Sequence, residues 1–574
     1  MLDVLIIGSG GAGLTAALAA KEISTVEGVG LGDASILVVG KTYPTNAQTS
    51  MAQGGINAAL GNVEEDHIAS HIADTIKSAH GLCDEDMVRQ MCADAPKTIA
   101  WLESIGVPFS RLHLGGQVIH DSSLHDKSHL GGQVIHDSSL HDKSQITRPL
   151  STIAQRQMGG ASAKRACYAQ DYTGLKMLHT LYDTCLKAHI DFLDEHYLLN
   201  LVTEKTSTDT IVKGATFLDI RTGEIKQIHA KSVIIATGGY GSLYHGYTTN
   251  AYGTTGDGIA AVLRAGGAVS DMEFVQFHPT ALKNSSILIS ESARGEGGYL
   301  INSDGERFVD ELKPRDEVAR AIFEQFQEGK EVFLDVRHLG EKKLMELLPQ
   351  EVALCKLHEG VNPAKELIPI KPVAHYSMGG IDVDYALEVN GIKGCFAVGE
   401  CSNAKVHGAN RLGGNSLLEI TAFGRFAGEN AYKHAVYASN KKADERQLQQ
   451  DKKEIETIYK KENSLNFYEK RESLGKLLYE KVGIVRDNIN LTKAMEEVIA
   501  MQVMQKKMGL SDKNRENNTN LIEFLEFQNA LLLAPTIISS ALARNESRGA
   551  HFKLGFERQD DEKFKQHIVL QWKD

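Results

Sequence analysis

A glycine-rich turn between a strand and a helix, close to the start of the chain, most constrains the fold. LDVLIIG is a continuous apolar run typical of a buried strand, and GLTAALAAKE continues with the 3.6-residue period of a helix. The turn between them has G-x-G-x-x-G spacing. In such turns the first glycine makes the bend, the second lets a pyrophosphate approach backbone N–H groups, and the third lets helix and strand pack. The stretch therefore predicts a Rossmann-like dinucleotide-binding domain with a phosphate loop made of Gly8, Gly10, Gly11, Ala12 and Gly13.

Two more strand patterns end in glycine far along the chain, in SVIIATGGYG (232–241) and in GCFAVGE at the start of 394–419. Three such signals, widely separated in sequence, predict one discontinuous α/β domain that converges on one cofactor. The acid that usually ends the second strand and binds the NAD ribose is replaced by Gly40-Lys41. This replacement argues against NAD, which relies on that acid.

The length of 574 residues exceeds a single hydrophobic core, so several domains are expected. We expect a discontinuous cofactor-binding domain, an inserted α+β capping domain rich in paired charges, a helical domain with a charged face, and a short polar C-terminal segment. The cofactor-binding domain is predicted to comprise 1–271 and 373–432, and the capping domain 272–372. The helical domain is predicted at 433–543 and the C-terminal segment at 544–574.

Composition excludes several other classes. The net charge of −12 argues against a nucleic-acid surface. The seven cysteines contain no C-x-x-C pair, so no metal site or iron–sulfur cluster is expected within the chain. Because the chain begins directly with a strand pattern, no secretory signal is expected. The most apolar stretch, 530–543, is predicted to be too short to span a bilayer and contains Pro535.

One 16-residue segment, HLGGQVIHDSSLHDKS, occurs twice in tandem, at 113–128 and 129–144. Two copies are too few and too short for a solenoid. Its six histidines lack a tight ligand spacing such as H-x-x-x-H, so a metal site is not favoured over a surface insertion.

Seven motifs occur in order along the chain. They are the glycine-rich turn, AQGGINAAL (52–60), DMEFVQFHPT (271–280), ESARGEGGYLIN (291–302), PRDEVARAI (314–322), HYSMGG (375–380) and HGANRLGGNSLLE (407–419). Together they resemble the flavoprotein subunits of succinate dehydrogenase and fumarate reductase, a family that also includes soluble fumarate reductases and L-aspartate oxidase. The resemblance implies FAD and a capping domain that closes over a C4 dicarboxylate.

The resemblance also implies which residues surround the FAD. Backbone N–H groups near the AQGG turn would face flavin N5 and O4, where negative charge develops on reduction. Glu400 would hold the adenosine ribose, and the NSLLE turn would lie near the flavin pyrimidine edge. The cofactor-binding residues predicted beyond the phosphate loop are Lys41, Gln48, Thr49, Ser50, Gln53, Gly54, Gly55, Ala236, Thr237, Gly238, Asp257, Glu400, Asn415, Ser416 and Leu417.

The resemblance further implies how the substrate is held and protonated. His278, His375 and Arg411 would bind the two carboxylates with help from Ser290, and Arg411 suits a carboxylate through its bidentate guanidinium. Arg315 would donate a proton to the substrate carbon. Glu291 would resupply it through Arg294, in the order Glu291–Arg294–Arg315. The E-x-x-R spacing places both relay side chains on one side if that segment is a helical turn.

Three positions bear on how far the family pattern applies. Gln48 stands where the membrane-complex enzymes have a histidine bonded to the flavin, so we expect non-covalent FAD and a more strongly donating reduced flavin. Met158 stands where a phenylalanine usually packs over the substrate, and the more flexible methionine leaves that packing open. Asp171 and Thr173 match a family motif and are interpreted as structural.

Three hypotheses follow. The first is the catalytic subunit of a succinate dehydrogenase or fumarate reductase complex, which exchanges electrons with an iron–sulfur subunit and a membrane-anchoring, quinone-reactive subunit. Such a chain would be cytoplasmic and bound peripherally to the inner face of the cell membrane. The second is L-aspartate oxidase, which needs no partner, and Gln48 and Glu419 favour it. The third is a non-catalytic FAD-containing subunit, which the complete set of arginines and histidines disfavours.

Overall fold

A seven-stranded sheet forms the centre of the predicted cofactor-binding region. The structure is a computed structural model that describes residues 1–26, 32–112, 118–119 and 152–572. The strand order is β8-β2-β1-β11-β10-β9, and β18 pairs with β11. The pairs within β8-β2-β1-β11-β18 are parallel, whereas β10 is antiparallel to both β9 and β11. The strands are β1 (Leu2–Ile7), β2 (Ile36–Val39), β8 (Asp191–Leu193), β9 (His196–Lys205), β10 (Thr210–Asp219), β11 (Ile225–Ile235) and β18 (Cys395–Ala397).

The register brings the ends of distant strands to one edge of the sheet. Ile7 at the end of β1 lies opposite both Val39 of β2 and Ile235 of β11. The glycine-rich turn therefore begins between the ends of its two neighbouring strands. Ligands of open parallel sheets bind at this carboxyl edge.

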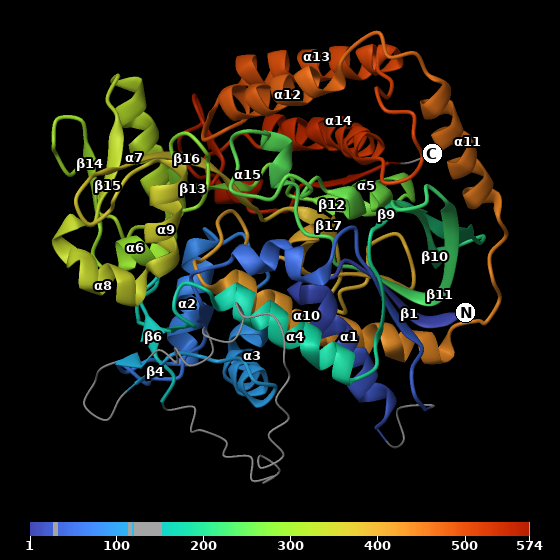
Figure 1. The fold of residues 1–574 in the computed structure, drawn as a ribbon, viewed down its shortest axis with the longest axis horizontal. Helices are drawn as coiled ribbons and strands as arrows, with labels where there is room; N and C mark the ends of the chain where they lie inside the picture. Colours follow the sequence, from blue (N-terminus) through green and yellow to red (C-terminus); the bar gives the residue numbers. More distant parts are fainter. Residues whose placement is uncertain (27–31, 113–117, 120–151, 573–574) are drawn as a thin grey trace, which may run out of the picture.

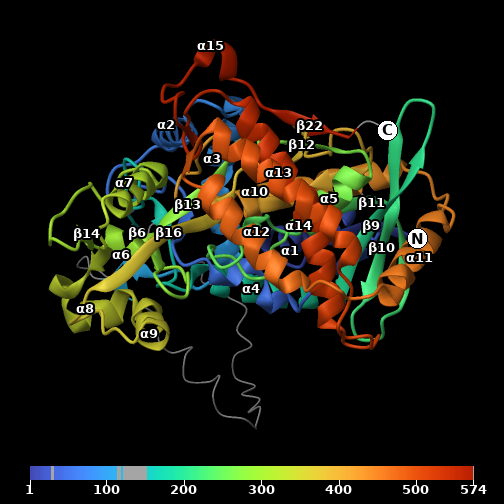
Figure 2. The ribbon, with the colours of Figure 1, turned by 90° about the horizontal axis from the view of Figure 1, so that it is seen from above.

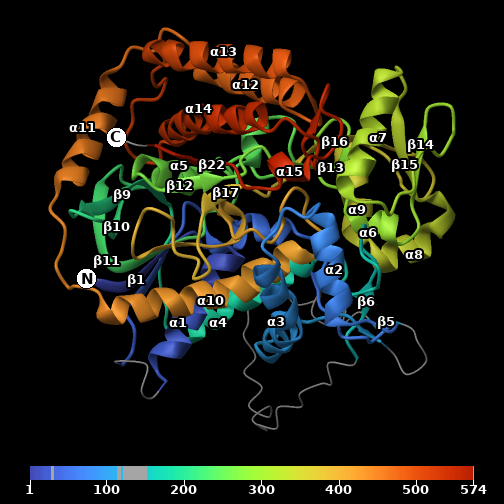
Figure 3. The same cartoon turned by 180° about the vertical axis from the view of Figure 1, so that it is seen from behind.

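Helix α1 (Gly11–Ser24) follows the turn and packs against α10 (Asn415–Tyr437), nearly 400 residues away in sequence. A Cβ atom at Gly428 of α10 would lie 2.1 Å from the carbonyl oxygen of Ala16, so the two helices approach more closely than a side chain would allow. Figure 1 shows α1, α4 (Thr173–Lys187) and α10 side by side along one face of the molecule, and Figure 3 shows the same grouping from behind. This packing joins the two sequence-distant parts of the predicted discontinuous domain.

The predicted capping region has its own sheet and its own core. Its strands follow the order β13-β16-β15-β14, and its buried apolar side chains form a cluster separate from the main core, from Leu282 to Ile370. Figure 1 shows this unit at one end of the molecule. Strand β16 runs across the predicted boundary at 372, whereas β13 begins three residues after the predicted boundary at 272, and both boundaries stay predictions. The elements are β13 (Val275–Leu282), α6 (Glu291–Gly295), β14 (Tyr299–Asn302), α7 (Arg315–Gln327), β15 (Val332–Asp335), α8 (Gly340–Leu347), α9 (Pro349–His358) and β16 (Ile368–Ser377).

The helical region lies against the opposite side of the sheet domain from α10 (Figure 1). Its elements are α11 (Arg446–Lys460), α12 (Phe467–Lys481), α13 (Asn488–Met504) and α14 (Thr519–Ala543). The prediction that the apolar stretch near Pro535 is too short to span a bilayer needs correction, because α14 begins 11 residues earlier than that stretch and has 25 residues. In its most apolar window, 72% of the residues are buried inside the protein, as in the core helix of a globular domain.

The C-terminal segment returns to the sheet domain. Strand β22 (Val569–Gln571) pairs with β12 (Ala268–Ser270), and Figure 2 shows these two strands next to each other. Strand β12 also pairs with β17 (Gly380–Asp382). The pairing of β20 (Val485–Arg486) with β21 (Phe552–Lys553) ties the segment to the helical region. The tandem repeat at 113–144 falls almost wholly outside the described residues, apart from β5 (Val118–Ile119), which pairs with β4 (Arg111–Leu112).

Further elements of the fold are the 3-10 helix η2 (Gln48–Met51), the helices α2 (Ile68–Ser78), α3 (Glu85–Ser104), α5 (Asp257–Arg264) and α15 (Asp561–Phe564), and the short strands β3 (Ile56–Asn57), β6 (Gln155–Arg156), β7 (Ala166–Cys167) and β19 (Ser402–Asn403).

Candidate active site and cofactor cradle

The three glycines of the phosphate loop have different structural roles. Gly8 has φ of +116°, and a Cβ atom there would lie 2.1 Å from the oxygen of Ala236. A Cβ atom at Gly13 would lie 1.9 Å from the oxygen of Gly8. A Cβ atom at Gly10 would meet its nearest atoms at 3.6 Å, which is an ordinary contact. Packing within the protein thus requires Gly8 and Gly13, whereas Gly10 leaves the space that a close ligand needs.

The segment before the AQGG turn is anchored to the start of α1. Thr49 Oγ1 accepts a hydrogen bond from Gly11 N at 3.1 Å, and Gln48 Oε1 accepts one from Ala251 N at 2.8 Å. The structure therefore brings Thr49 and Gln48 together with the phosphate loop and with the loop that precedes α5. Gln48 acts as a hydrogen-bond acceptor for backbone at this junction.

The AQGG turn itself contains a buried polar atom that the protein leaves without a partner. Gln53 is 5% exposed, and its Oε1 has no hydrogen-bond partner among the described residues. Met158 packs directly against the turn, because a Cβ atom at Gly54 would lie 2.7 Å from Met158 Cε. A Cβ atom at Gly413, from the HGANRLGG motif, would lie 3.4 Å from Met158 Cβ. Met158 thus fills the space between the two glycine-rich motifs.

Helix α10 begins at the NSLLE turn without a capping side chain. Its N-cap is Gly414, which has φ of +87°. The amide of Asn415 is fully used inside the protein, because it contacts Asn57 at 2.8 Å, His71 at 3.0 Å and Thr75 at 3.0 Å. The backbone N–H groups of this turn, which are unsatisfied at a helix start, are available for a cofactor contact.

Lys41 and Asp257, both predicted to bind the cofactor, bind each other. The ammonium of Lys41 donates to Gly253 O at 2.6 Å, to Asp257 at 2.7 Å and to Glu526 of α14 at 2.7 Å. Tyr197 also donates to Asp257 at 3.0 Å. These two charged groups hold the loop before α5 against the helical region, and their contact with the cofactor stays a prediction.

Glu400 is the residue predicted to hold the adenosine ribose. It follows β18, which is separated from β2 by β11 and β1, whereas an adenosine ribose binds beyond β2. Its carboxylate accepts from Ser377 N at 2.9 Å. Burial raises the pKa of Glu400 to about 7. The adenosine contact stays a prediction, and the structure places this position beside Ser377 of β16, the strand that also carries His375. Ala236, Thr237 and Gly238 follow β11, and Thr237 Oγ1 has no described partner.

The predicted catalytic residues converge between the sheet domain and the capping region. Arg315, the first residue of α7, donates through Nε and Nη2 to Glu291 Oε2 at 3.0 and 2.6 Å. Its Nη1 donates to Gln276 Oε1 at 3.0 Å, and Arg411 Nη2 donates to the same oxygen at 3.1 Å. One amide oxygen, that of Gln276, therefore accepts from both arginines. The side chains involved are all buried: those of Arg315, Arg411, Gln276 and Glu291.

The predicted relay order Glu291–Arg294–Arg315 needs correction. Glu291 lies between the two arginines, because its other oxygen, Oε1, is 3.5 Å from Arg294 Nη2. Glu291 and Arg294 are on one side of the short helix α6, as the E-x-x-R spacing predicts. Although burial opposes ionisation, Arg315 and Arg294 lower the pKa of the Glu291 carboxyl. Ser290 is the N-cap of α6, and its hydroxyl accepts from Ser292 N at 3.2 Å.

The two predicted histidines lie against each other, with ring centroids 4.8 Å apart. His278 Nδ1 accepts from Thr280 N at 3.2 Å, so the neutral ring carries its proton on Nε2. His375 Nδ1 contacts Thr249 Oγ1 at 2.7 Å. Burial and the nearby charge of Arg315 lower the pKa of both histidines well below the usual range. Both rings are therefore neutral hydrogen-bonding groups at neutral pH.

The cluster has more positive charge than its own acids neutralise. Arg294 and Arg315 contact one carboxylate, that of Glu291, and Arg411 is joined to Arg315 through Gln276, so the three guanidiniums have one carboxylate among these contacts. Arg294 Nε and Nη2 and Arg411 Nε have no hydrogen-bond partner among the described residues. Burial and the neighbouring Arg315 lower the pKa of Arg411 to about 10. A buried site with three guanidiniums, one contacting carboxylate and free N–H donors suits a dianionic ligand.

Two residues of the site were not singled out from the sequence. Gln276 precedes His278 by two positions on β13, and such spacing places residues on the same face of a strand, so it offered a signal. Tyr376 follows His375, and its ring lies 4.2 Å from the Arg411 guanidinium. Nothing in its sequence pattern indicated this stacking, which depends on the fold.

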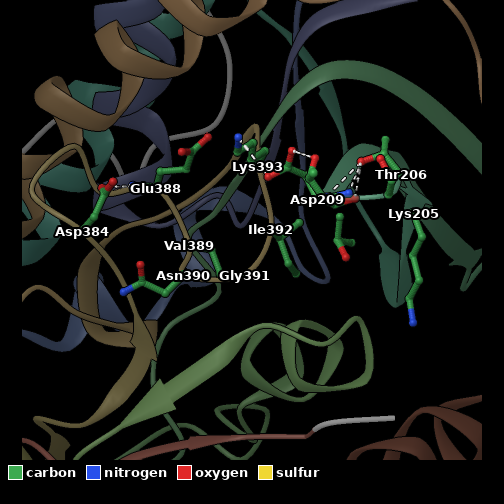
Figure 4. A pocket seen from close by; sticks show the side chains of 13 residues that line it. Lys205, Thr206, Asp209, Asp384, Glu388, Val389, Asn390, Gly391, Ile392 and Lys393 are labelled. Carbon is green, nitrogen blue, oxygen red and sulfur yellow. Dashed lines mark hydrogen bonds and ion pairs between the residues drawn. The ribbon is translucent and has the colours of Figure 1, made fainter.

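A separate surface hollow contains none of the predicted site residues. It lies between the turn joining β9 and β10 and the loop 384–393, and Lys393 there pairs with Asp209 at 3.0 Å (Figure 4). Its mixed charges do not form the convergent cation cluster that the buried site has.

Known proteins share this architecture. A family profile described as an FAD binding domain matches residues 3–417, and one described as fumarate reductase flavoprotein C-term matches residues 471–574. The chain is 35% identical over 598 residues to the fumarate reductase flavoprotein subunit of Haemophilus influenzae, with 99% of this chain and 91% of that protein covered. It is 37% identical to the succinate dehydrogenase flavoprotein subunit of Coxiella burnetii, with 99% and 94% covered. A solved quinol fumarate reductase of E. coli matches with a TM-score of 0.87 at 35% identity, covering 99% of this chain and 94% of that one.

Proposed function

The chain belongs to the family of the fumarate reductase and succinate dehydrogenase flavoprotein subunits, and we propose that it catalyses the FAD-dependent interconversion of succinate and fumarate. The observation that carries the proposal is the buried cluster of Arg294, Arg315 and Arg411 beside the cofactor cradle, which has one carboxylate, that of Glu291, among its direct contacts. Succinate and fumarate are dianions of matching charge.

The cradle fits FAD in three respects. Gly10 leaves room for a pyrophosphate, the start of α10 offers uncapped N–H groups, and Gln53 Oε1 is a buried polar atom with no partner in the part of the chain that the structure describes. When bound, FAD would supply the hydride chemistry of the reaction. We propose that the phosphate loop and Thr49 hold its pyrophosphate side, and that residues 50–55, Glu400 and the turn 415–417 hold its flavin side.

The substrate residues divide into anchors and proton-transfer groups. Arg411 would bind one carboxylate through its free donor, and the neutral His278 and His375 would hydrogen-bond the other with Ser290. Arg315 would give a proton to the substrate carbon in fumarate reduction and take one in the reverse direction. Glu291, 2.6 to 3.0 Å from two Arg315 nitrogens, is placed to return or accept that proton. Arg294 would help keep Glu291 ionised.

We expect the FAD to be held without a covalent bond. Gln48 stands at the position of the flavin-linking histidine, an amide is not a nucleophile, and its oxygen is already engaged by Ala251 N at 2.8 Å. Acid precipitation of the purified chain should leave essentially all flavin in the supernatant, measured by its absorbance. Flavin fluorescence that stays with the precipitated protein would contradict this expectation.

A partner would carry electrons to and from the flavin. Among the described residues no group of three His, Cys, Asp or Glu side chains could hold a metal, so an iron–sulfur subunit and a membrane-anchoring, quinone-reactive subunit are proposed. Two exposed apolar side chains lie close in sequence to the Gln48–Ala251 contact: Met51 shortly after Gln48, and Tyr252 directly after Ala251. We propose that the iron–sulfur subunit docks on this surface. Attachment to the inner face of the cell membrane would then be indirect.

An anaerobic titration tests the function. Flavin absorbance of the purified chain should fall on addition of succinate, and chemically reduced flavin should be reoxidised by fumarate. L-aspartate should leave the spectrum unchanged. Bleaching by L-aspartate in place of succinate would favour the oxidase, and with it a chain that needs no electron-carrying partner.

A further inference from the structure

Two buried carboxyl groups meet at the boundary between the sheet domain and the capping region, outside the proposed substrate site. Asp171 lies in the loop between β7 and α4, and Glu351 lies in the first turn of α9. Asp171 is fully buried and Glu351 is 4% exposed. The proposed reaction uses neither of them.

Asp171 caps a helix that belongs to the other region. Helix α9 has no capping side chain of its own and has Pro349 at its first position. Asp171 Oδ2 accepts from Gln350 N at 2.8 Å and from Glu351 N at 3.4 Å. These are backbone donors that a helix start otherwise leaves unsatisfied, so Asp171 supplies the N-cap from across the boundary.

Glu351 continues the connection to the catalytic helix. Its Oε1 accepts from Ser290 N at 3.0 Å, and Ser290 is the residue before Glu291 at the start of α6. The chain of contacts therefore runs from Asp171 through the first turn of α9 to the backbone that places Ser290 and Glu291. A shift of α9 would move both residues relative to Arg315.

The charges around the pair do not compensate two carboxylates. Asp171 Oδ1 and Glu351 Oε2 have no hydrogen-bond partner among the described residues. The cation near them, Arg156, lies over the ring of Tyr168 at 3.5 Å and donates to Gln170 O at 2.5 Å. The other titratable groups that face this cluster are Tyr172, Glu296 and Cys355. None of these adds a positive charge.

We propose that Asp171 and Glu351 form an acid pair that keeps at least one proton and thereby positions Ser290 and Glu291 for the reaction, an inference that rests on the proposed function. Burial raises the pKa of Asp171 to about 6 and that of Glu351 well above its usual range. The folded protein binds these protons more tightly than the unfolded chain, so proton binding stabilises the fold at low pH. This stabilisation is lost as pH rises from the ordinary carboxyl pKa to the raised pKa values of Asp171 and Glu351 in the folded protein. At higher pH, ionisation of both groups would weaken the contact between α9 and Asp171.

Hydrogen exchange of the full chain tests the pair without turnover. In the wild type, the protection factors of peptides covering 290–298 and 349–358 should fall at least about tenfold between about pH 6 and pH 9, after correction for intrinsic exchange. The Glu351→Gln variant keeps an acceptor for Ser290 N and cannot ionise, so its protection should change by less than about twofold. The exposed Glu341→Gln variant on α8 serves as the matched control and should behave as the wild type.

Kinetics tests the positioning role. Glu351→Leu removes the acceptor, and its kcat for fumarate reduction should fall at least about tenfold while KM changes by less than about threefold. At about pH 6 the kcat of Glu351→Gln should match that of the wild type. At alkaline pH its kcat should lack the decline that we assign to ionisation of Asp171 and Glu351. Unchanged pH dependence in Glu351→Gln, or wild-type kcat in Glu351→Leu, would overturn the proposal. A wild-type chain with no dicarboxylate turnover but with the expected exchange results would reject the proposed function and support the acid pair.

Discussion

The Arg315→Lys variant should lose at least about a thousandfold in kcat while its positive charge is kept. Arg315 uses three nitrogens at once, two toward Glu291 and one toward Gln276. Lysine has one nitrogen on a flexible stem and cannot hold both partners in this geometry. The proton would then no longer be aligned with the substrate carbon.

Lysine is preferred to alanine for this test because it keeps the charge balance. Removing the guanidinium altogether would leave Glu291 Oε2 without its hydrogen-bond donors and the carboxylate with Gly159 N at 3.0 Å and Arg294 at 3.5 Å, and breaking a buried ion pair costs about 3–5 kcal/mol of stability. Fumarate reduction by a reduced dye gives kcat, and the change in flavin absorbance on adding a dicarboxylate gives its binding. Binding should weaken far less than turnover.

The exposed Arg337, which pairs with Asp335 at 2.8 Å on the capping region, provides the control. Arg337→Lys should change kcat by less than about twofold, as expected for a surface ion pair. If Arg315→Lys retained more than a tenth of the wild-type kcat, another group would have to supply the proton.

Gly13→Ala should disrupt the fold, whereas Gly10→Ala should leave the fold intact and weaken FAD binding. At Gly13 the new Cβ atom would lie 1.9 Å from Gly8 O, so α1 cannot keep its place on β1. We expect Gly13→Ala to be insoluble or largely unfolded. At Gly10 the new atom would meet protein only at 3.6 Å. Gly10→Ala should therefore fold as apoprotein with nearly unchanged circular dichroism, and should bind FAD at least about tenfold more weakly, a loss of about 1.4 kcal/mol.

Bound flavin per chain and the melting temperature of the apoprotein separate the two effects. Gly10→Ala with full flavin content would mean that the cofactor does not approach the loop closely at this position. Gly13→Ala that folds and melts like the wild type would mean that α1 and β1 tolerate a separation that their packing does not indicate.

The sequence alone was sufficient where structure depends on neighbours along the chain. The strand–turn–helix at the start, the E-x-x-R turn of α6 and the α/β class of the domain all follow from local periodicity and from the conformational freedom of glycine. The order of the seven motifs was sufficient to indicate the family, which the full-length matches establish.

Only the tertiary structure decided which side chains meet. It placed Glu291 between Arg294 and Arg315, joined Arg315 to Arg411 through Gln276, and paired Lys41 with Glu526, 485 residues away. It placed Glu400 after β18, which is separated from β2 by β1 and β11, and it buried most of α14 inside the protein. Local patterns encode backbone conformation and which face is apolar, whereas the partner of a buried charge depends on packing between elements that are distant in sequence. No spacing rule specifies that packing.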